Sequence, residues 1–163
     1  MKTLEIVFEQ DNGFVPRVIR WLTRSDVNHV ALRYLSEDWT SEWVAEAAAR
    51  GVRAVPDHGR KWKHRFIVKY NAVADVQAAQ KYIGERYDFV GLVLFGVFIV
   101  AWRWLKVKLR RPMHPTSGQF CSEFVAHMLN PKIPFPEPQW VTPQDILLVC
   151  QDRVDLFQRV ESP

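Results

Sequence analysis

The longest uncharged stretch of the sequence decides whether the chain spans a membrane or folds as a globular protein. Phe89 to Trp102 is a run of 14 residues without a charge. A spanning helix needs about 20 apolar residues to cross a hydrocarbon core of roughly 30 Å. Extending the run to Leu105 leaves it short and places Arg103 inside it. We therefore favour a buried core helix, then a helix lying on a membrane surface, over a true span.

Length and composition predict one globular domain. The 163 residues suit a single domain at 1–163, with an apolar and basic insert at about 89–111. Hydrophobic residues make up 48% of the chain, which excludes a disordered or low-complexity protein. Glu5 and Glu9 interrupt the apolar N-terminus, so no secretory signal is predicted. We expect a cytoplasmic protein, with membrane association through the insert as a second possibility.

The net charge of +4 is unevenly distributed. The segments Arg50–Arg65 and Arg103–Arg111 each carry a net +5, so the rest of the chain carries −6. Either basic segment suits an anionic partner such as a phosphate or a lipid headgroup. No nucleic-acid recognition motif accompanies these bases, so nucleic acid is not an expected partner.

Hydrophobic periodicity predicts an α+β fold with an antiparallel sheet. The segment Ser41–Arg50 is ambiguous, because its alanines and the following Gly51 suit a helix. We favour a strand at Trp43–Ala47 that pairs back onto the preceding strand. The other strands are expected at 4–8, 28–35, 53–56, 64–70 and 154–160, and the helices at 14–24, 72–86, 120–129 and from Thr142 onward.

Cys121 is the residue with the clearest chemical potential. It lies in the first turn of a predicted helix, directly after a turn that contains Gly118. A thiol there faces the partial positive charge of the helix N-terminus, which favours the nucleophilic thiolate. The free N–H groups of that turn can hold a developing oxyanion. The alternative is a buried structural cysteine, which is the interpretation we favour for Cys150.

A cysteine nucleophile needs a base, and His29 is the candidate that the neighbouring strands favour. An antiparallel hairpin between the strands at 28–35 and 43–47, with its turn centred at 37–38, places His29 opposite Glu46. A carboxylate beside an imidazole fixes its tautomer and stabilises the imidazolium. The other histidines lie in basic or loop segments or on the far side of the Cys121 helix: His58, His64, His114 and His127.

Several short segments occur in an order that resembles one known family. The chain is similar to the circularly permuted NlpC-type papain-like cysteine hydrolases, the YiiX-like branch, which is related to lecithin:retinol acyltransferase. In that branch the histidine precedes the cysteine, as it does here. The insert at about 89–111 departs from the family pattern. The matching segments cover about residues 4 to 148 and are 6–8, 28–32, 44–47 with 51–52, 87–88, 120–125 and 142–146.

The resemblance implies a papain-like fold, circularly permuted, with an antiparallel sheet packed against helices and the nucleophile at a helix N-terminus. It implies Cys121 as nucleophile, His29 as base and Glu46 as the orienting group. Three further residues are candidates for substrate binding or for the oxyanion hole: Tyr87, Gln119 and Ser122. Tyr87 is equally consistent with a packed aromatic side chain, and Gln119 with an ordinary loop residue.

The predicted function is a cysteine hydrolase, an amidase or peptidase that acts through an acyl-enzyme on a substrate such as a cell-wall peptide. One alternative is a lipid-directed thiol acyltransferase or deacylase that docks on anionic membranes through Phe89–Arg111. A second alternative is a catalytically silent structural module. The expected partner is a peptide or lipid substrate with anionic groups. No CxxC, HExxH or Gly-rich phosphate loop occurs, so neither a metal nor a cofactor is expected.

Overall fold

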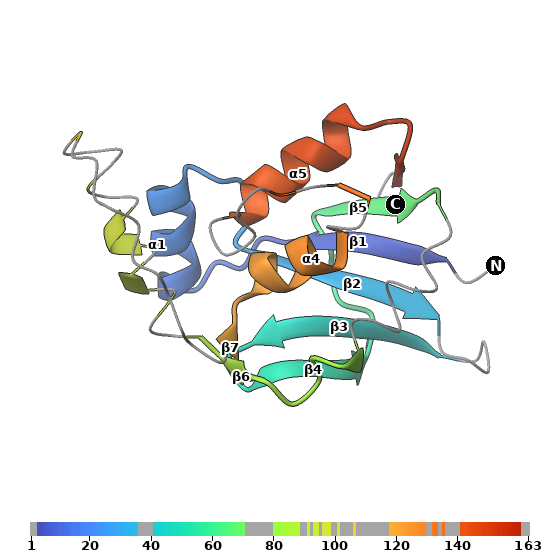
Figure 1. Cartoon of the computed structure of the whole chain (residues 1–163), viewed down its shortest axis with the longest axis horizontal. Coiled ribbons are helices and arrows are strands. Elements are labelled where there is room, and N and C mark those ends of the chain that lie inside the picture. Colours follow the sequence, from blue (N-terminus) through green and yellow to red (C-terminus); the bar gives the residue numbers. More distant parts are fainter. Residues whose placement is uncertain are drawn as a thin grey trace.

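The described part of the chain forms an α+β fold, a six-stranded antiparallel sheet with two helices packed on one face (Figure 1). The predicted insert at 89–111 and the predicted helix at 72–86 lie largely outside the described residues. The computed structural model describes residues 3–35, 41–70, 80–88, 91, 93–94, 96–98, 101, 106, 118–129, 132–133, 135 and 141–160.

The sheet has the strand order β4-β3-β2-β1-β5-β8, and every neighbouring pair is antiparallel. The strand interpretation of 41–50 is confirmed, because pairing on both sides of β3 overrides the helical propensity of its alanines. The strands are β1 (Leu4–Glu9), β2 (His29–Leu35), β3 (Glu42–Ala48), β4 (Gly51–Pro56), β5 (His64–Val68) and β8 (Phe157–Val160).

The main core lies between the sheet and the helices α4 (Cys121–Leu129) and α5 (Pro143–Asp152). Alternate strand residues such as Val30 and Leu32 point into it, together with Phe124 from α4. The predicted start of α5 is confirmed, since Thr142 and Asp145 form a reciprocal capping box. The core fixes which face of each strand is apolar and places the N-terminus of α4 at one end of the sheet (Figure 1).

The opposite face of the sheet is covered by the connection between β4 and β5. This connection must cross three strands, because β4 and β5 are separated by β3, β2 and β1. Trp62 packs there against Val7, Ala31 and Val44. Asp57 accepts a hydrogen bond from the Nε of Arg33 at 2.7 Å, so the connection is held by charged as well as apolar contacts.

The hairpin between β2 and β3 differs in register from the prediction. Leu32 pairs with Ala45 and Leu35 with Glu42, so facing residues are shifted by two positions from the expected pairing. His29 therefore does not lie directly opposite Glu46. A shift of two preserves the face, since side chains alternate with a period of two, and both residues remain on the same side of the sheet.

Three smaller elements surround the end of the sheet where β2 begins (Figure 1). The helix α1 (Phe14–Thr23) confirms the prediction for 14–24 and ends at Arg24, which adopts a left-handed conformation with φ 50°. The short strands β6 (Arg86–Tyr87) and β7 (Gly118–Gln119) pair in parallel. The predicted helix at 72–86 does not reach its expected end, because 81–84 form turns and Arg86 belongs to β6.

Candidate active site

Cys121 begins α4 and is 7% exposed. It follows β7 by one residue, and β7 is fixed by its pairing with β6, where Tyr87 lies opposite Gln119. The first-turn N–H groups of α4 have no acceptor within their own helix, so their dipoles converge near the thiol. The predicted placement of Cys121 at a helix N-terminus is confirmed.

His29 joins Cys121 to Glu46. It is the first residue of β2, and its Nε2 lies 2.9 Å from the Oε2 of Glu46 on β3. Its side chain is also hydrogen-bonded to Cys121, and Nδ1 is the ring nitrogen that Glu46 leaves available. Glu46 is completely buried and the His29 side chain is 14% exposed. The structure thus brings together the three residues that the sequence singled out.

The surroundings of His29 favour its charged form. Burial alone would lower its pKa, but the hydrogen bonds and negative charges of Cys121 and Glu46 outweigh burial and raise the pKa of His29 to about 10. For Glu46, burial acts to raise the pKa, whereas His29 and two arginines lower it well below the ordinary value. At neutral pH the pair therefore consists of an imidazolium and a carboxylate.

Two arginines that the sequence analysis did not assign to the site hold Glu46 in place. Arg53, its direct partner on β4, donates from Nε and Nη2 to Glu46 Oε1 at 3.0 and 2.7 Å. Arg60, from the connection behind the sheet, donates from Nη1 to Oε2 at 2.8 Å. Glu46 thus meets three cationic groups. The only signal for this role was the basic segment at 50–65, which was interpreted as a surface for anions.

Three arginines of the first basic segment have partners inside the protein. Arg53 and Arg60 bind Glu46, and Arg65 binds Glu5 at 2.9 Å, so these guanidinium groups neutralise internal carboxylates. Arg50 and Lys61 are exposed. Part of the positive charge of the segment therefore neutralises carboxylates within the protein. It supports the candidate site and is not evidence for an anionic substrate alone.

The three candidate accessory residues have different surroundings. Burial raises the pKa of Tyr87, and the charges of the nearby Cys121 and Asp88 raise it further. Gln119 is 6% exposed, and its Oε1 has no hydrogen-bond partner among the described residues. The hydroxyl of Ser122 donates to the carbonyl of Val141 at 2.6 Å, so this side chain fastens α4 to the segment before α5.

The second cysteine has a different environment. Cys150 is 1% exposed within the main core, and burial raises the pKa of its thiol. The prediction that Cys150 is structural agrees with this position. The two thiols of the chain are therefore distinguished by location, one at a helix N-terminus beside a histidine and one among apolar side chains.

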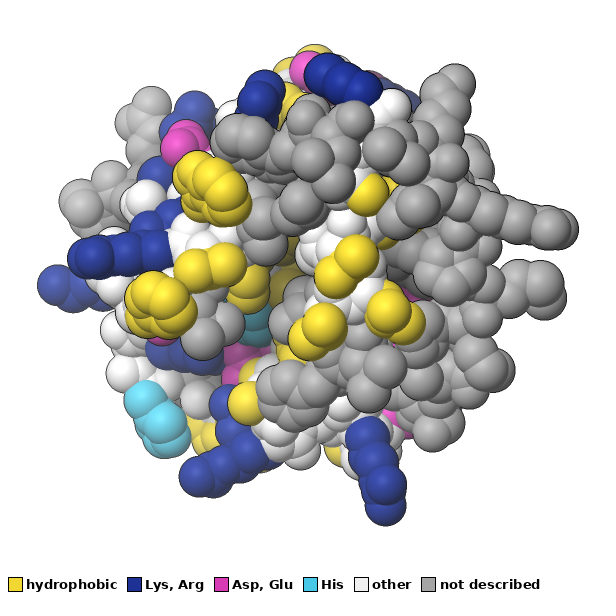
Figure 2. All heavy atoms as spheres, turned by 90° about the vertical axis from the view of Figure 1, so that its left-hand side faces the viewer, with side chains coloured by type: hydrophobic (Ala, Val, Ile, Leu, Met, Phe, Trp, Pro, Cys, Tyr) yellow, Lys and Arg dark blue, Asp and Glu magenta, His cyan; other side chains and the backbone are white. Residues whose placement is uncertain are grey.

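Figure 2 shows the end of the molecule at which α1, β6 and β7 lie. A histidine and an acidic side chain are recessed between hydrophobic groups, with lysines and arginines around the margin. Among the described residues, no helix combines the length and the apolarity that crossing a membrane requires. A scan against models of protein families found no match for this chain, and a search of curated protein sequences found none either.

Proposed function

We propose that the protein is a cysteine hydrolase that cleaves an amide bond through a covalent acyl-enzyme, with Cys121 as nucleophile, His29 as acid and base, and Glu46 as orienting group. The observation that carries the proposal is that the His29 side chain is hydrogen-bonded both to Cys121 and to the buried carboxylate of Glu46. Nucleophilic catalysis requires this spatial order: a nucleophile, a base beside it, and a group that orients the base.

Each step has a group to perform it. The Sγ of Cys121 attacks the carbonyl carbon, forming a C–S bond and an oxyanion. Collapse of the oxyanion breaks the C–N bond, and the His29 imidazolium gives its proton to the departing amine. His29 then takes a proton from a water molecule as its oxygen attacks the thioester carbonyl; the C–S bond breaks, the carboxylic acid leaves, and the Cys121 thiolate and the His29 imidazolium are restored. Glu46 keeps the imidazole oriented throughout.

The oxyanion has two sources of donors near Cys121. The N–H groups of the first turn of α4 are the first source. The side-chain N–H groups of Gln119 are the second, since this residue is buried and precedes Cys121 by two positions. Ser122 is withdrawn from this role as a side chain, because its hydroxyl is engaged with Val141.

The order of elements supports a circularly permuted papain-like fold. The histidine strand and the carboxylate strand come first, and the cysteine begins a later helix that packs on the same sheet. This order is the one that the YiiX-like branch would have. The substrates to test first are therefore cell-wall peptides, which carry both amide bonds and carboxylates.

Selective alkylation of the two cysteines tests the proposal. With iodoacetamide at pH 7, we expect Cys121 to be modified about tenfold or more faster than a free thiol, because it lies at a helix N-terminus beside His29. His29→Ala should slow this modification, and Cys150 should stay unmodified in the folded protein. Peptide mass spectrometry gives the rate at each cysteine, and Cys150→Ala is the matched variant that should leave the Cys121 rate unchanged.

Turnover provides the decisive outcome. Incubation with amide substrates should yield an adduct on Cys121 whose mass identifies the acyl group, and Cys121→Ala should abolish hydrolysis. Hydrolysis that persists in both Cys121→Ala and His29→Ala contradicts the mechanism. A Cys121 that reacts no faster than a free thiol supports the structural module instead.

Lipid-directed chemistry is a second candidate because hydrophobic side chains are exposed at the same end as the site. Phe14 is 83% exposed and Val93 is 65% exposed, and both belong to elements near that end (Figure 1). The same thiol would take an acyl group from a lipid ester, with an alcohol as the leaving group. An adduct of fatty-acyl mass on Cys121 after exposure to phospholipid vesicles would favour this candidate over the amidase.

A further inference from the structure

The helix α1 presents hydrophobic side chains to solvent. Phe14, Val18 and Trp21 follow one another at spacings of four and three residues, so they lie on one side of the helix. They are 83%, 38% and 60% exposed. The periodicity that predicted a helix here therefore does not reflect packing against the main core. A cluster of exposed hydrophobic side chains of this kind marks an interaction surface.

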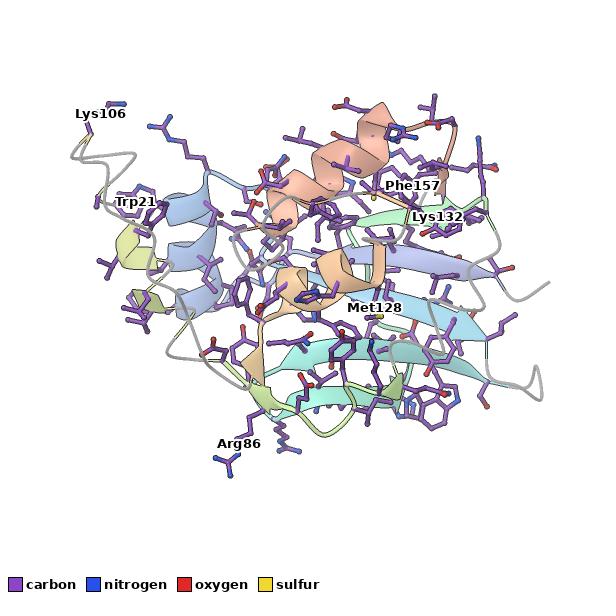
Figure 3. The ribbon with its side chains drawn as sticks, in the orientation of Figure 1. Trp21, Arg86, Lys106, Met128, Lys132 and Phe157 are labelled. Atoms are coloured by element: carbon purple, nitrogen blue, oxygen red, sulfur yellow. The ribbon has the colours of Figure 1, made fainter. Side chains whose placement is uncertain are left out.

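A second hydrophobic segment reaches the surface at the same end of the molecule. The described residues between 91 and 101 are helical, and Val93, Leu94 and Val97 are 65%, 37% and 55% exposed. Figure 2 shows hydrophobic side chains gathered on this one face, and Figure 3 places Trp21 and Lys106 together at the end that carries α1. The two elements therefore contribute to one surface.

Both elements contain bases and no acids. The stretches 13–25 and 89–111 together contain eight Lys and Arg residues and not one Asp or Glu. Arg17 and Lys106 are exposed. Arg20 instead donates to the side chain of Asn28 at 3.2 Å, which fastens α1 to the residue before His29. Hydrophobic side chains beside bases alone match a surface with an apolar interior and anionic headgroups.

We propose that the protein docks on anionic lipid bilayers through this surface, with Phe14, Val18 and Trp21 of α1 and Val93, Leu94 and Val97 of the second segment entering the headgroup region. Trp21 suits that region because a membrane interface accommodates both its apolar ring and its polar N–H group. The flanking bases attract phosphate groups. Because α1 leads through 24–28 into His29, docking places the end of the molecule that carries Cys121 toward the lipid.

The chemistry of the surface favours a bilayer over a protein partner. A protein interface would need complementary acids opposite each of these bases and a shaped apolar pocket, whereas a fluid headgroup layer adapts to both. Binding should therefore depend on the fraction of anionic lipid and fall with salt. It should not depend on the nucleophile, so Cys121→Ala should bind vesicles as the wild type does.

Vesicle flotation tests the proposal with the full-length protein. We expect the wild type to float with phosphatidylcholine vesicles that contain one-quarter phosphatidylglycerol, and about tenfold less with pure phosphatidylcholine. Phe14→Ser combined with Trp21→Ser should reduce the flotation about tenfold. Arg17→Gln combined with Lys106→Gln should weaken binding to the anionic vesicles and leave binding to pure phosphatidylcholine vesicles unchanged. The thermal unfolding temperature of each variant shows that the loss is not caused by unfolding.

A matched control comes from the other end of the molecule. Leu148 and Val154 are 46% and 68% exposed and belong to α5 and the turn that follows it. Leu148→Ser combined with Val154→Ser removes comparable hydrophobic exposure and should leave flotation unchanged. Absence of flotation with either vesicle overturns the proposal, as does equal loss in both double variants. Self-association that is lost in the α1 variant without any vesicle binding also overturns it, in favour of a protein interface.

Discussion

His29 is the residue whose state depends most on its neighbours. Its ring is held between the Cys121 side chain and the Glu46 carboxylate, and its pKa is raised to about 10. An ordinary unfolded histidine titrates near 6.5. A group whose pKa is higher in the folded state stabilises the fold fully below its unfolded pKa, and this stabilisation is lost as the pH rises through the folded pKa.

The comparison of wild type with His29→Gln should reveal this stabilisation. We expect the difference between their free energies of unfolding to be largest below about pH 6.5 and to shrink as the pH rises toward 10, by a few kcal/mol in total. Urea unfolding at several pH values measures it. A difference that stays constant over this range would show that His29 is not held as an imidazolium.

Arg60 is expected to act through Glu46 rather than on a substrate. Its removal by Arg60→Met leaves a buried carboxylate with one donor fewer, which costs roughly 1–3 kcal/mol. The pKa of Glu46 is lowered in the fold, so its stabilisation is present above the unfolded pKa and is lost as the pH falls through the folded one. Arg60→Met reduces this lowering.

Acid unfolding of Arg60→Met should therefore begin at a higher pH than in the wild type. Circular dichroism between pH 7 and pH 2 follows the transition. Arg153→Gln is the control, because Arg153 binds only the exposed Asp155 in the described structure and its loss should leave the transition where it is. An unchanged transition in Arg60→Met would mean that Arg53 and His29 hold Glu46 without it.

The sequence was sufficient to predict the three central residues but not their support. Cys121 could be identified from its position at the start of a predicted helix. His29 and Glu46 could be identified because side chains alternate along two paired strands, which places both residues on the same face of the sheet. Arg53 was missed because the pairing of β4 with β3 was not predicted. Arg60 was missed because it reaches Glu46 only through the connection that crosses behind the sheet. The path of that connection depends on the strand order, which no local pattern of residues contains.

At the scale of elements, the contact between β4 and the segment that ends in β6 supports the proposed nucleophile. Val52 donates its N–H to the carbonyl of Glu85 and accepts from the N–H of Gly84, both at 2.8 Å. Gly51 has φ +100°, and a Cβ on it would lie 2.4 Å from the Glu85 carbonyl oxygen. Only glycine fits this position. Since β6 pairs with β7, which is separated from Cys121 only by Phe120, the contact fixes the entry to α4.

Gly51→Ala should separate β4 from β6. We expect a loss of about 2–4 kcal/mol in the free energy of unfolding, from backbone strain and the clash together. Alkylation of Cys121 should slow in the same variant. Gly59→Ala is the matched control, because Gly59 has φ +73° with nothing within 4 Å of an added Cβ. It should lose only about 1 kcal/mol through strain and leave alkylation unchanged.

The errors at this scale have clear physical origins. The hairpin register was wrong by two residues because the turn centre does not follow from the strand pattern, whereas the buried face does. The helix α1 was predicted from its period of apolar residues, and that period does not say whether they meet a core or a solvent-exposed surface. The exposure of Phe14 and Trp21 is visible only in the folded chain.

At the scale of the whole molecule, positive charge is used in two ways. On the sheet, Arg33, Arg53, Arg60 and Arg65 are all paired with internal carboxylates. Near α1, the bases accompany exposed hydrophobic side chains. The overall charge of +4 therefore combines an internal network that holds the fold with a surface that, in our proposal, meets lipid. High salt should affect vesicle binding strongly and the buried Glu46 network much less.

The strand order has a consequence for the biosynthesis of the protein. Five of the six sheet strands come from the first 68 residues, and β8 joins the edge at β5 only at the end of the chain. Because a chain leaves the ribosome N-terminus first, His29, Glu46 and both supporting arginines emerge well before Cys121. The thiol becomes part of the site only when α4 docks. A ribosome-bound chain that ends before α4 thus contains the proposed base and orienting group without the proposed nucleophile, which is the last of the three to arrive.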